Sequence, residues 1–254
     1  MSQAYKAICK LTVIPVRSNP NDTAEMVTQL LFGDLVTCIS SIKNWVEIII
    51  NHDQYKGWVD EKQLLKINTQ EAEAIAKVKT YQLNNTLSLK TPWGEQLILS
   101  GSPVLSKEKQ FSINDLSFEW KNNTPKQDTK DLLECAKSYL NAPYLWGGKT
   151  RFGIDCSGLT QTVYQQIGIQ LKRDASQQVK QGEDIELGKQ KAGDLAFFES
   201  TTTGKITHVG ILLNENEIIH AHGRVRIDQL DSKGIYNRES EYYSHQYHSI
   251  RRYI

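Results

Sequence analysis

The first half of this 254-residue chain consists of short strand-like runs, and near residue 128 the pattern changes to helices. Residues 9 to 67 contain four such runs, separated by turn-forming stretches such as SNPND and NHDQ. The runs are CKLTVIPVR, DLVTCIS, WVEIII and YKGWVDEKQLLKI. Short, regularly interrupted strands of this kind predict a small antiparallel barrel over residues 1–67. The segment TAEMVTQLLFGD has apolar residues at helical spacing but also suits an extended loop, so its conformation stays open.

A second all-β unit is expected over residues 68–125. It begins with NTQEAEAIAKVKT, which has the pattern of a short polar helix, and continues with LSLK, WGEQLILSGSPVL, KQFSI and LSFEW. These strand-like runs with glycine and proline between them predict a second small barrel. The polar stretch KNNTPKQDTK has no periodic apolar residues and is expected to link this barrel to the next domain.

The third domain, residues 126–254, has an α+β pattern with its helices first. Asp128 or Thr129 can cap a helix whose apolar stripe is formed by Leu132, Leu133, Ala136 and Leu140. A second helix follows GIDCSG and ends at Gly168, where a left-handed residue is favoured. The runs GDLAFF, ITHVGILL and EIIHAHG then predict an antiparallel sheet.

Composition and charge exclude some classes of protein. Hydrophobic residues make up 39% of the chain and charged residues 23%, with a formal charge of +1, so neither disorder nor nucleic-acid binding is indicated. The first residues lack the apolar stretch of about 7–15 residues that a secretory signal needs, and no run is long enough to span a membrane. We therefore expect a cytoplasmic protein without membrane contact, in which the four cysteines are thiols.

Cys156 is the first candidate for chemistry, because it lies at the start of the helix that ends at Gly168. A nucleophilic cysteine needs its thiolate form, and the N–H groups and dipole at a helix start favour an anion there. The helix start is therefore a device that lowers the pKa of a thiol, and the sequence leaves open whether Cys156 has a lowered pKa. The same N–H groups could hold the oxyanion of a tetrahedral intermediate. The alternative is a buried cysteine that only packs, but polar Asp155 and Ser157 are poor core neighbours.

A nucleophilic cysteine also needs a base and a group that orients the base. His208, His220 and His222 are the candidates, and strand alternation decides which of them share a face. A four-residue hairpin loop would put the later histidines on the wrong face. A three-residue loop over 214–216 pairs residue 210 with 220, so that His220 lies diagonal to His208 and Gly210 leaves room for it. Spacing alone leaves His222 open as the third group.

A zinc site built from Cys156 and the histidines is an alternative, although only His220 and His222 have the close spacing that structural sites use. His52, His245 and His248 are expected to be ordinary surface or packed histidines. We therefore predict no metal and no cofactor.

Six ordered motifs in the third domain give a resemblance to a known family. They are APYLWGG, DCSGLTQTVYQQIGI, RDASQQ, AGDLAFF, THVGILL and IIHA. These motifs resemble those of the NlpC-like cell-wall cysteine peptidases. The stretches PVRSNPNDTAEMVTQLLFGD and YKGWV are similar to the bacterial SH3-like domains that accompany such peptidases.

The resemblance implies a papain-like α+β catalytic domain preceded by two SH3-like barrels. Within it Cys156 would be the nucleophile, His208 the base and His220 the group that orients the base, which favours His220 over His222. It also implies that Tyr144 helps line the oxyanion site. The residues that it implies face the substrate are Asp155, Ser157, Arg173 and Asp174.

Within this family the chain is most similar to the γ-D-glutamyl-L-diamino acid endopeptidases, which release L-Ala-D-Glu from murein peptides with a free N-terminal L-Ala. The resemblance implies that the first SH3-like domain helps to hold that amine. An ammonium group needs a carboxylate and an acceptor, for which we nominate Glu25 and Tyr55, with Asp34 as a competitor. Together with the missing export signal, it points to an enzyme that recycles cell-wall peptides inside the cell. We expect a monomer. An amidase or acyltransferase using the same residues, or a catalytically silent binding module, are the alternatives.

Overall fold

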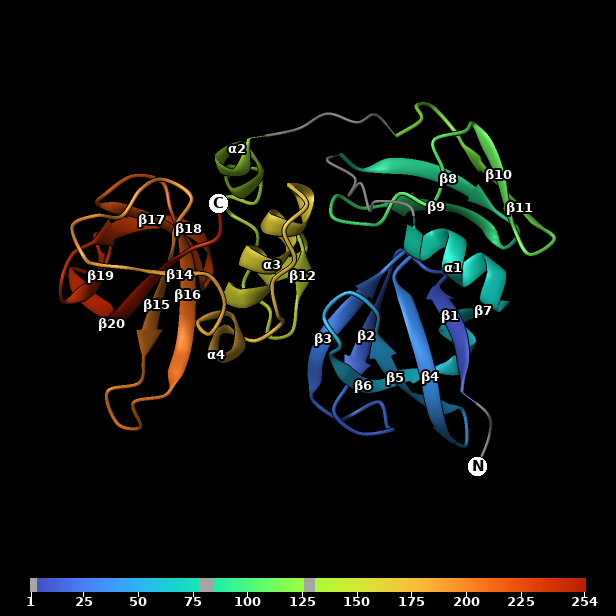
Figure 1. Ribbon diagram of the computed structural model, residues 1–254, viewed down its shortest axis with the longest axis horizontal. Coiled ribbons are helices and arrows are strands. Elements are labelled where there is room, and N and C mark those ends of the chain that lie inside the picture. Colours follow the sequence, from blue (N-terminus) through green and yellow to red (C-terminus); the bar gives the residue numbers. More distant parts are fainter. Residues whose placement is uncertain (1–3, 78–84, 126–130) are drawn as a thin grey trace. The chain divides into compact units, whose positions relative to one another are not determined.

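The computed structural model describes residues 4–77, 85–125 and 131–254, and its contacts divide the chain into two compact units, Met1–Thr129 and Lys130–Ile254 (Figure 1). No helix within these described residues is long and apolar enough to cross a membrane. All four cysteines are buried thiols, as expected.

The first unit begins with a seven-stranded antiparallel sheet in the order β3-β2-β6-β5-β4-β1-β7. Its strands are β1 (Tyr5–Cys9), β2 (Val13–Arg17), β3 (Met26–Leu31), β4 (Leu35–Ile42), β5 (Trp45–Ile50), β6 (Lys56–Asp60) and β7 (Leu64–Ile67), with a 3₁₀ turn at Glu61–Gln63. The segment whose conformation the sequence left open is strand β3. It pairs with β2 and buries Thr28 and Leu30 at alternate positions. Burial at every second residue is typical of a strand, so the segment is extended despite the helical spacing of its apolar residues.

A second, four-stranded sheet follows in the order β10-β11-β8-β9. It contains β8 (Leu87–Thr91), β9 (Gly94–Ile98), β10 (Gln110–Ile113) and β11 (Leu116–Trp120), and helix α1 (Thr69–Lys77) precedes it. Its buried residues Phe118 and Trp120 belong to one apolar cluster with Ile8 of β1 and Phe32, which directly follows β3. The two sheets therefore share a core, and the boundary at residue 67 between two barrels stays a prediction.

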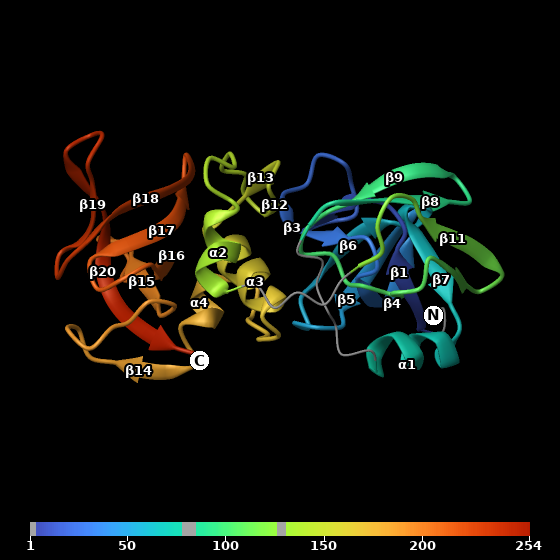
Figure 2. The ribbon, with the colours of Figure 1, turned by 90° about the horizontal axis from the view of Figure 1, so that it is seen from above.

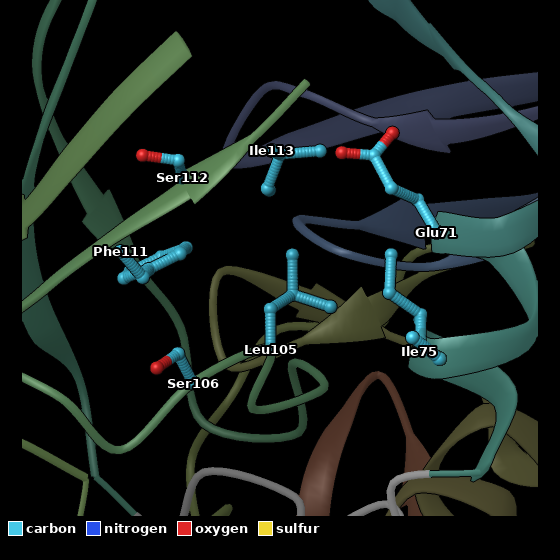
Figure 3. Close-up of a pocket in the computed structure, with 8 residues that line it drawn as sticks. Glu71, Ile75, Leu105, Ser106, Phe111, Ser112 and Ile113 are labelled. Atoms are coloured by element: carbon cyan, nitrogen blue, oxygen red, sulfur yellow. The ribbon is translucent and has the colours of Figure 1, made fainter. Parts of the chain in front are cut away.

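A cavity of about 260 Å³ lies in the first unit between helix α1 and strand β10. Ile75 projects into it from α1, Phe111 and Ile113 line it from β10, and Leu105 lies between them (Figure 3). The lining is largely apolar.

The second unit combines three helices with a two-stranded sheet and a seven-stranded antiparallel sheet (Figure 2). The helices are α2 (Leu132–Lys137), α3 (Cys156–Gln166) and α4 (Ala175–Gln178), and the strands are β12 (Lys149–Thr150), β13 (Gly153–Ile154), β14 (Glu183–Ile185), β15 (Leu195–Glu199), β16 (Ile206–Leu212), β17 (Glu217–His222), β18 (Arg224–Leu230), β19 (Gly234–Asn237) and β20 (Tyr242–Arg252). Strands β15 to β20 are hydrogen-bonded in sequence order, and β20 pairs with both β15 and β19. The six strands therefore close into a ring.

Alternation along these strands separates two cores. Phe198, Leu212 and Ile218 are buried together in one apolar cluster, whereas Ile211 and Ile219 are buried with Leu159 and other residues of α3 in another. Because β16 buries Leu212 in the first cluster, His208 and Gly210 face the same side of the strand as this cluster.

The expected helices are present, with corrections at their ends. Helix α2 is capped by Asp131, whose carboxylate accepts a hydrogen bond from the Leu133 N–H, whereas the caps predicted at Asp128 and Thr129 lie outside the described residues. Leu140 was expected on the buried stripe of this helix, but it follows the helix end and is 39% exposed. Helix α3 ends as expected, with Gly168 at a φ of +85°.

Candidate active site

Cys156 is the first residue of helix α3, and the residue before it organises the helix start. The Asp155 side chain caps the helix by accepting a hydrogen bond from the Gly158 N–H at 2.6 Å, and its other oxygen accepts from the Gly147 N–H at 2.8 Å. The cap ties the helix start to the loop that carries the LWGG motif. Cys156 is thereby held at a fixed place with only 7% of its surface exposed.

Arg173 completes this cap as a buried cation. Its two terminal nitrogens lie 3.0 and 2.6 Å from the two Asp155 oxygens, and it also donates to the Ser157 hydroxyl at 2.8 Å. The structure therefore brings Asp155, Ser157 and Arg173 together as one bonded group. Asp174 follows as the cap residue of α4, where its backbone N–H donates to the Gln177 side chain at 3.3 Å.

The hairpin between β16 and β17 has the register that the three-residue loop requires. Gly210 pairs with His220, and the Leu213 N–H donates to the Glu217 carbonyl oxygen to close the loop. His208 and His220 consequently lie on one face, with His208 Nε2 2.8 Å from His220 Nδ1. The prediction of an odd loop is confirmed.

Gly210 makes room for this pair. A Cβ at this position would lie 2.7 Å from Ile218 Cδ1 and 2.9 Å from His220 Cβ, both closer than real Cβ contacts allow. We predict that Gly210→Ala lowers the free energy of unfolding by about 1–3 kcal/mol, because the hairpin side chains must shift. Urea denaturation measures this effect. Gly204→Asn is the matched control, because Gly204 has open space and a φ of +64° that asparagine tolerates; equal stability losses for both variants would contradict the prediction.

Two charged residues that sequence analysis missed lie beside the histidines. His220 Nε2 is 3.0 Å from Asp228 Oδ2, and Arg226 donates to Asp228 Oδ1 at 3.0 Å. Both residues come from β18, where Arg226 pairs with His220 across the strands. Alternation in RVRIDQL could have placed them on the histidine side, but alternate charged residues are more typical of an exposed face.

His245 on β20 is a further neighbour that the sequence did not single out. Its ring stacks on that of His208, with centroids 3.8 Å apart and planes at 19°. The ring of His222, the open candidate for the third group, has its centroid 6.2 Å from that of His220. His220, and not His222, is the residue hydrogen-bonded to His208 in the structure.

Nitrogen atoms of His208, His220 and His245 lie within 4.8 Å of one another, a spacing that raises the question of a metal. Two nitrogens bound to one tetrahedral zinc ion lie about 3.4 Å apart, farther than the 2.8 Å between His208 and His220. The second nitrogen of His220 is occupied by Asp228. The arrangement fits a hydrogen-bonded chain of side chains better than a metal site.

The electrostatics answer one question about Cys156. Burial, and then the charge of Asp155, raise the pKa of its thiol to about 12, although the N–H groups of Val209 and Ser157 and the charge of Arg173 act in the opposite direction. Burial therefore outweighs the helix start, which answers the question that the sequence left open. Burial, with His245 and His220 nearby, lowers the pKa of His208 well below its usual value. The resting pair is a thiol and a neutral imidazole.

The backbone hydrogen bond from Val209 also places the thiol against strand β16, at the residue that follows His208. Tyr144 lies in the same region. Burial raises the pKa of its hydroxyl to about 12, and the proximity of Cys156 and Asp155 adds to the rise. Its side chain is 37% exposed.

The residues nominated for amine binding belong to the first unit. Glu25 is exposed and directly precedes β3, and Tyr55 is half-buried and directly precedes β6. Because β2 is antiparallel to both strands, the two residues lie at the same end of the sheet. The competitor Asp34 is buried, and its carboxylate accepts from the Leu31 N–H at 2.8 Å, which stabilises its own turn.

A cysteine at a helix start, held against the strand that carries an imidazole oriented by a second polar ring, is typical of a papain-like cysteine peptidase. Residues 141–252 match the NlpC/P60 family, and residues 16–64 match the bacterial dipeptidyl-peptidase SH3 domain. A γ-D-glutamyl-L-lysine dipeptidyl-peptidase of Bacillus subtilis is 31% identical over 216 residues, which cover 76% of this chain and 71% of that protein. The chain belongs to the NlpC/P60 family of cysteine peptidases.

Other comparisons agree. A γ-D-glutamyl-L-lysine dipeptidyl-peptidase of Bacillus cereus is 28% identical over 260 residues, covering 91% of this chain and 76% of that protein. The crystal structure of an NlpC/P60 family protein from Bacillus cereus matches with a TM-score of 0.77 at 23% identity, covering 98% of this chain and 99% of that one, which shows a common fold. The expected papain-like fold with an N-terminal SH3-like domain is confirmed.

Proposed function

We propose that this enzyme is a γ-D-glutamyl-L-diamino acid endopeptidase that releases L-Ala-D-Glu from murein peptides with a free N-terminal L-Ala. The observation that carries the proposal is the hydrogen-bonded pair His208–His220, with the Cys156 thiol bonded to the backbone of Val209 on the same strand as His208. The Bacillus relatives of this chain are named γ-D-glutamyl-L-lysine dipeptidyl-peptidases. Those names specify lysine, and the diamino acid cleaved by this enzyme, lysine or meso-diaminopimelate, is decided by the substrate panel below.

The reaction starts from the neutral pair. His208 uses Nε2 for the bond to His220, so its Nδ1 is the atom that takes the proton from Cys156. The thiolate attacks the carbonyl carbon of the γ-D-glutamyl bond and forms a tetrahedral intermediate. The N–H groups at the start of α3, with Tyr144, are the proposed donors to its oxyanion.

The second half of the reaction returns the proton. Protonated His208 donates it to the leaving amine of the diamino acid, which leaves L-Ala-D-Glu bound to Cys156 as a thioester. Water, deprotonated by His208, then attacks the thioester carbonyl and regenerates the thiol. These steps use only side chains and water.

The remaining substrate contacts are proposed from the family resemblance. Asp155, Ser157 and Arg173 already bond one another, so we propose that they present a rigid polar surface to the substrate, with Asp174 next to it. Glu25 and Tyr55 would hold the free ammonium group of L-Ala, and the first domain would thereby reject peptides still attached to glycan. The separate second barrel and its role stay predictions.

The test is mass spectrometry of the products from four peptides. L-Ala-γ-D-Glu carrying meso-diaminopimelate or lysine is incubated with the enzyme, alongside the same peptides N-acetylated. We expect L-Ala-D-Glu from a free-amine peptide only. Cleavage of the acetylated peptides at the same rate would contradict the proposed amine pocket but would still support cleavage of the γ-D-glutamyl bond. No cleavage of any peptide would favour an amidase, an acyltransferase or a binding module.

The amine pocket is tested further with Glu25→Gln, which removes the charge and keeps the shape. We expect a higher KM for the free-amine peptide with little change in kcat, because the residue contacts a part of the substrate remote from the cleaved bond. Glu47→Gln on β5 is a control for the loss of one carboxylate from the same sheet.

The pH dependence follows from the two pKa shifts. His208 must be unprotonated to act as base, and its pKa lies below 6.5, so kcat/KM should persist below pH 6.5 and fall only as the pH passes through the lowered value. His220, His222 and His245 face His208 and all act in this direction. With the Cys156 pKa raised to about 12, we predict a broad plateau on the alkaline side. A midpoint of the acid limb at or above 6.5 would contradict this.

The cellular role is proposed from the resemblance. We propose a monomeric, cytoplasmic enzyme that degrades cell-wall peptides for recycling. Cell fractionation with an antibody checks the location, and sedimentation velocity checks the monomer.

A further inference from the structure

The hydrogen-bonded chain that starts at His208 does not end at His220. It continues from His220 Nε2 to the Asp228 carboxylate, and Asp228 is 2% exposed. We propose that Asp228, held by Arg226, is a positioning residue that fixes the tautomer of His220 and thereby directs the unprotonated nitrogen of His208 toward Cys156. This inference rests on the proposed peptidase mechanism and goes beyond it.

The Asp228 carboxylate determines where His220 and His208 carry their ring protons. An ionised carboxylate can only accept a hydrogen bond, so the proton between His220 and Asp228 belongs to His220 Nε2. A neutral imidazole carries one proton, which makes His220 Nδ1 an acceptor. His208 Nε2, 2.8 Å away, must then be the donor, and His208 Nδ1 is left with a lone pair. This lone pair is what a general base needs.

The carboxylate stays ionised because of its partners. Burial by itself would raise the pKa of Asp228, but hydrogen bonds from His220 and Arg226 outweigh it and hold the pKa below its usual range. The Arg226 nitrogens lie 2.7 Å from Oδ2 and 3.0 Å from Oδ1 of this carboxylate. The opposite tautomer of His220 would place a lone pair against Asp228.

Arg226 is itself held from two further sides. It donates to Asn237 Oδ1 at 3.0 Å and to Glu239 Oε2 at 3.0 Å. Asn237 is 3% exposed and belongs to β19, so a third strand supports the carboxylate from behind. A buried carboxylate that accepts a hydrogen bond from one ring nitrogen of a histidine keeps the proton on that nitrogen. The tautomer of the imidazole is thereby fixed.

The first test needs no substitution. Nitrogen-15 NMR of the unaltered protein, with histidine labelled in the ring, distinguishes a protonated from an unprotonated ring nitrogen. Near pH 7.5 we expect the proton of His220 on Nε2 and that of His208 also on Nε2. A proton on His220 Nδ1 would overturn the proposal, whatever the substrate of the enzyme.

The second test replaces the carboxylate. Asp228→Ala should lower kcat by about 10²-fold and change KM by less than about threefold, because the residue contacts His220 and not the substrate. The His220 spectrum should show a mixture of tautomers. Asp231→Ala is the matched control, since Asp231 is an exposed acid just after the same strand, and it should keep the unaltered kcat.

Alkylation of Cys156 by iodoacetamide separates this inference from the proposed substrate. The rate is followed in the peptide that carries Cys156, so the assay works even if no murein peptide is cleaved. We expect alkylation at least about tenfold slower in Asp228→Ala than in Asp231→Ala. An unaltered rate in a folded Asp228→Ala variant would overturn the proposal, and if this variant does not fold, the spectrum of the unaltered protein decides.

Discussion

Replacement of Cys156 by alanine should lower kcat for cleavage of the γ-D-glutamyl bond by at least about 10⁴-fold. The thiol is the atom that forms the acyl intermediate, and the methyl group of alanine offers no substitute. The fold should persist, because the helix start is organised by Asp155 and Arg173 and not by the thiol. Product formation measured by mass spectrometry and a circular dichroism spectrum check both parts.

Cys135→Ala is the control for this experiment. Cys135 is a fully buried thiol on α2 in the same unit, so its loss removes comparable volume from the core without touching the site. It should lower stability slightly and leave kcat near that of the unaltered enzyme. Equal losses of activity in the two variants would mean that Cys156 serves packing and not catalysis.

Arg173→Met should cost about 3–5 kcal/mol of the free energy of unfolding, the largest stability effect expected here. Arg173 is 1% exposed and forms two bonds to Asp155, so methionine fills part of its volume but leaves a buried carboxylate without its cation. Urea denaturation of the second unit's transition measures the loss. Asp155 caps α3, which begins at Cys156, so a disturbed cap should also lower kcat.

Arg224→Met provides the comparison for a surface ion pair. Arg224 contacts Glu239 at 2.6 Å, but both side chains reach the solvent, with 40% and 59% of their surfaces exposed, so water replaces the lost partner. Its stability loss should be far smaller than that of Arg173→Met. Similar losses would show that the Arg173 ion pair contributes no more than a surface contact.

The register of the catalytic hairpin illustrates what the sequence could predict. Strand alternation puts His208 and His220 on one face only if the connecting loop has an odd length, and the structure has that loop, with Gly210 opposite His220. Helix α3 could also be predicted from the sequence, because Gly168 marks its end and Leu159 and Val163 mark its buried face. Both features are predicted by local hydrophobic periodicity, which is about 2 residues in a strand and about 3.6 residues in a helix.

Asp228, Arg226 and His245 could not be found in the same way. Arg226 and Asp228 lie on the strand of a local hairpin, but alternating charged residues there are more typical of an exposed face. His245 depends on the return of β20 to the histidines, which no local motif encodes. The raised pKa of Cys156 could not be predicted for a related reason. The helix start is visible in the sequence, but the burial that outweighs it arises from packing of distant strands.

The closed ring of strands has a consequence for how the catalytic unit folds. Strands β16, β17 and β18 form a meander of local hairpins, whereas closure requires β20 to pair with β15, for example Ile250 with Ala196. Non-local pairing of this kind slows folding, because the entropy of a long loop is lost before contacts are gained. During refolding, the bonds among His208, His220 and Asp228 can therefore form early, while the stacking of His245 on His208 waits for closure.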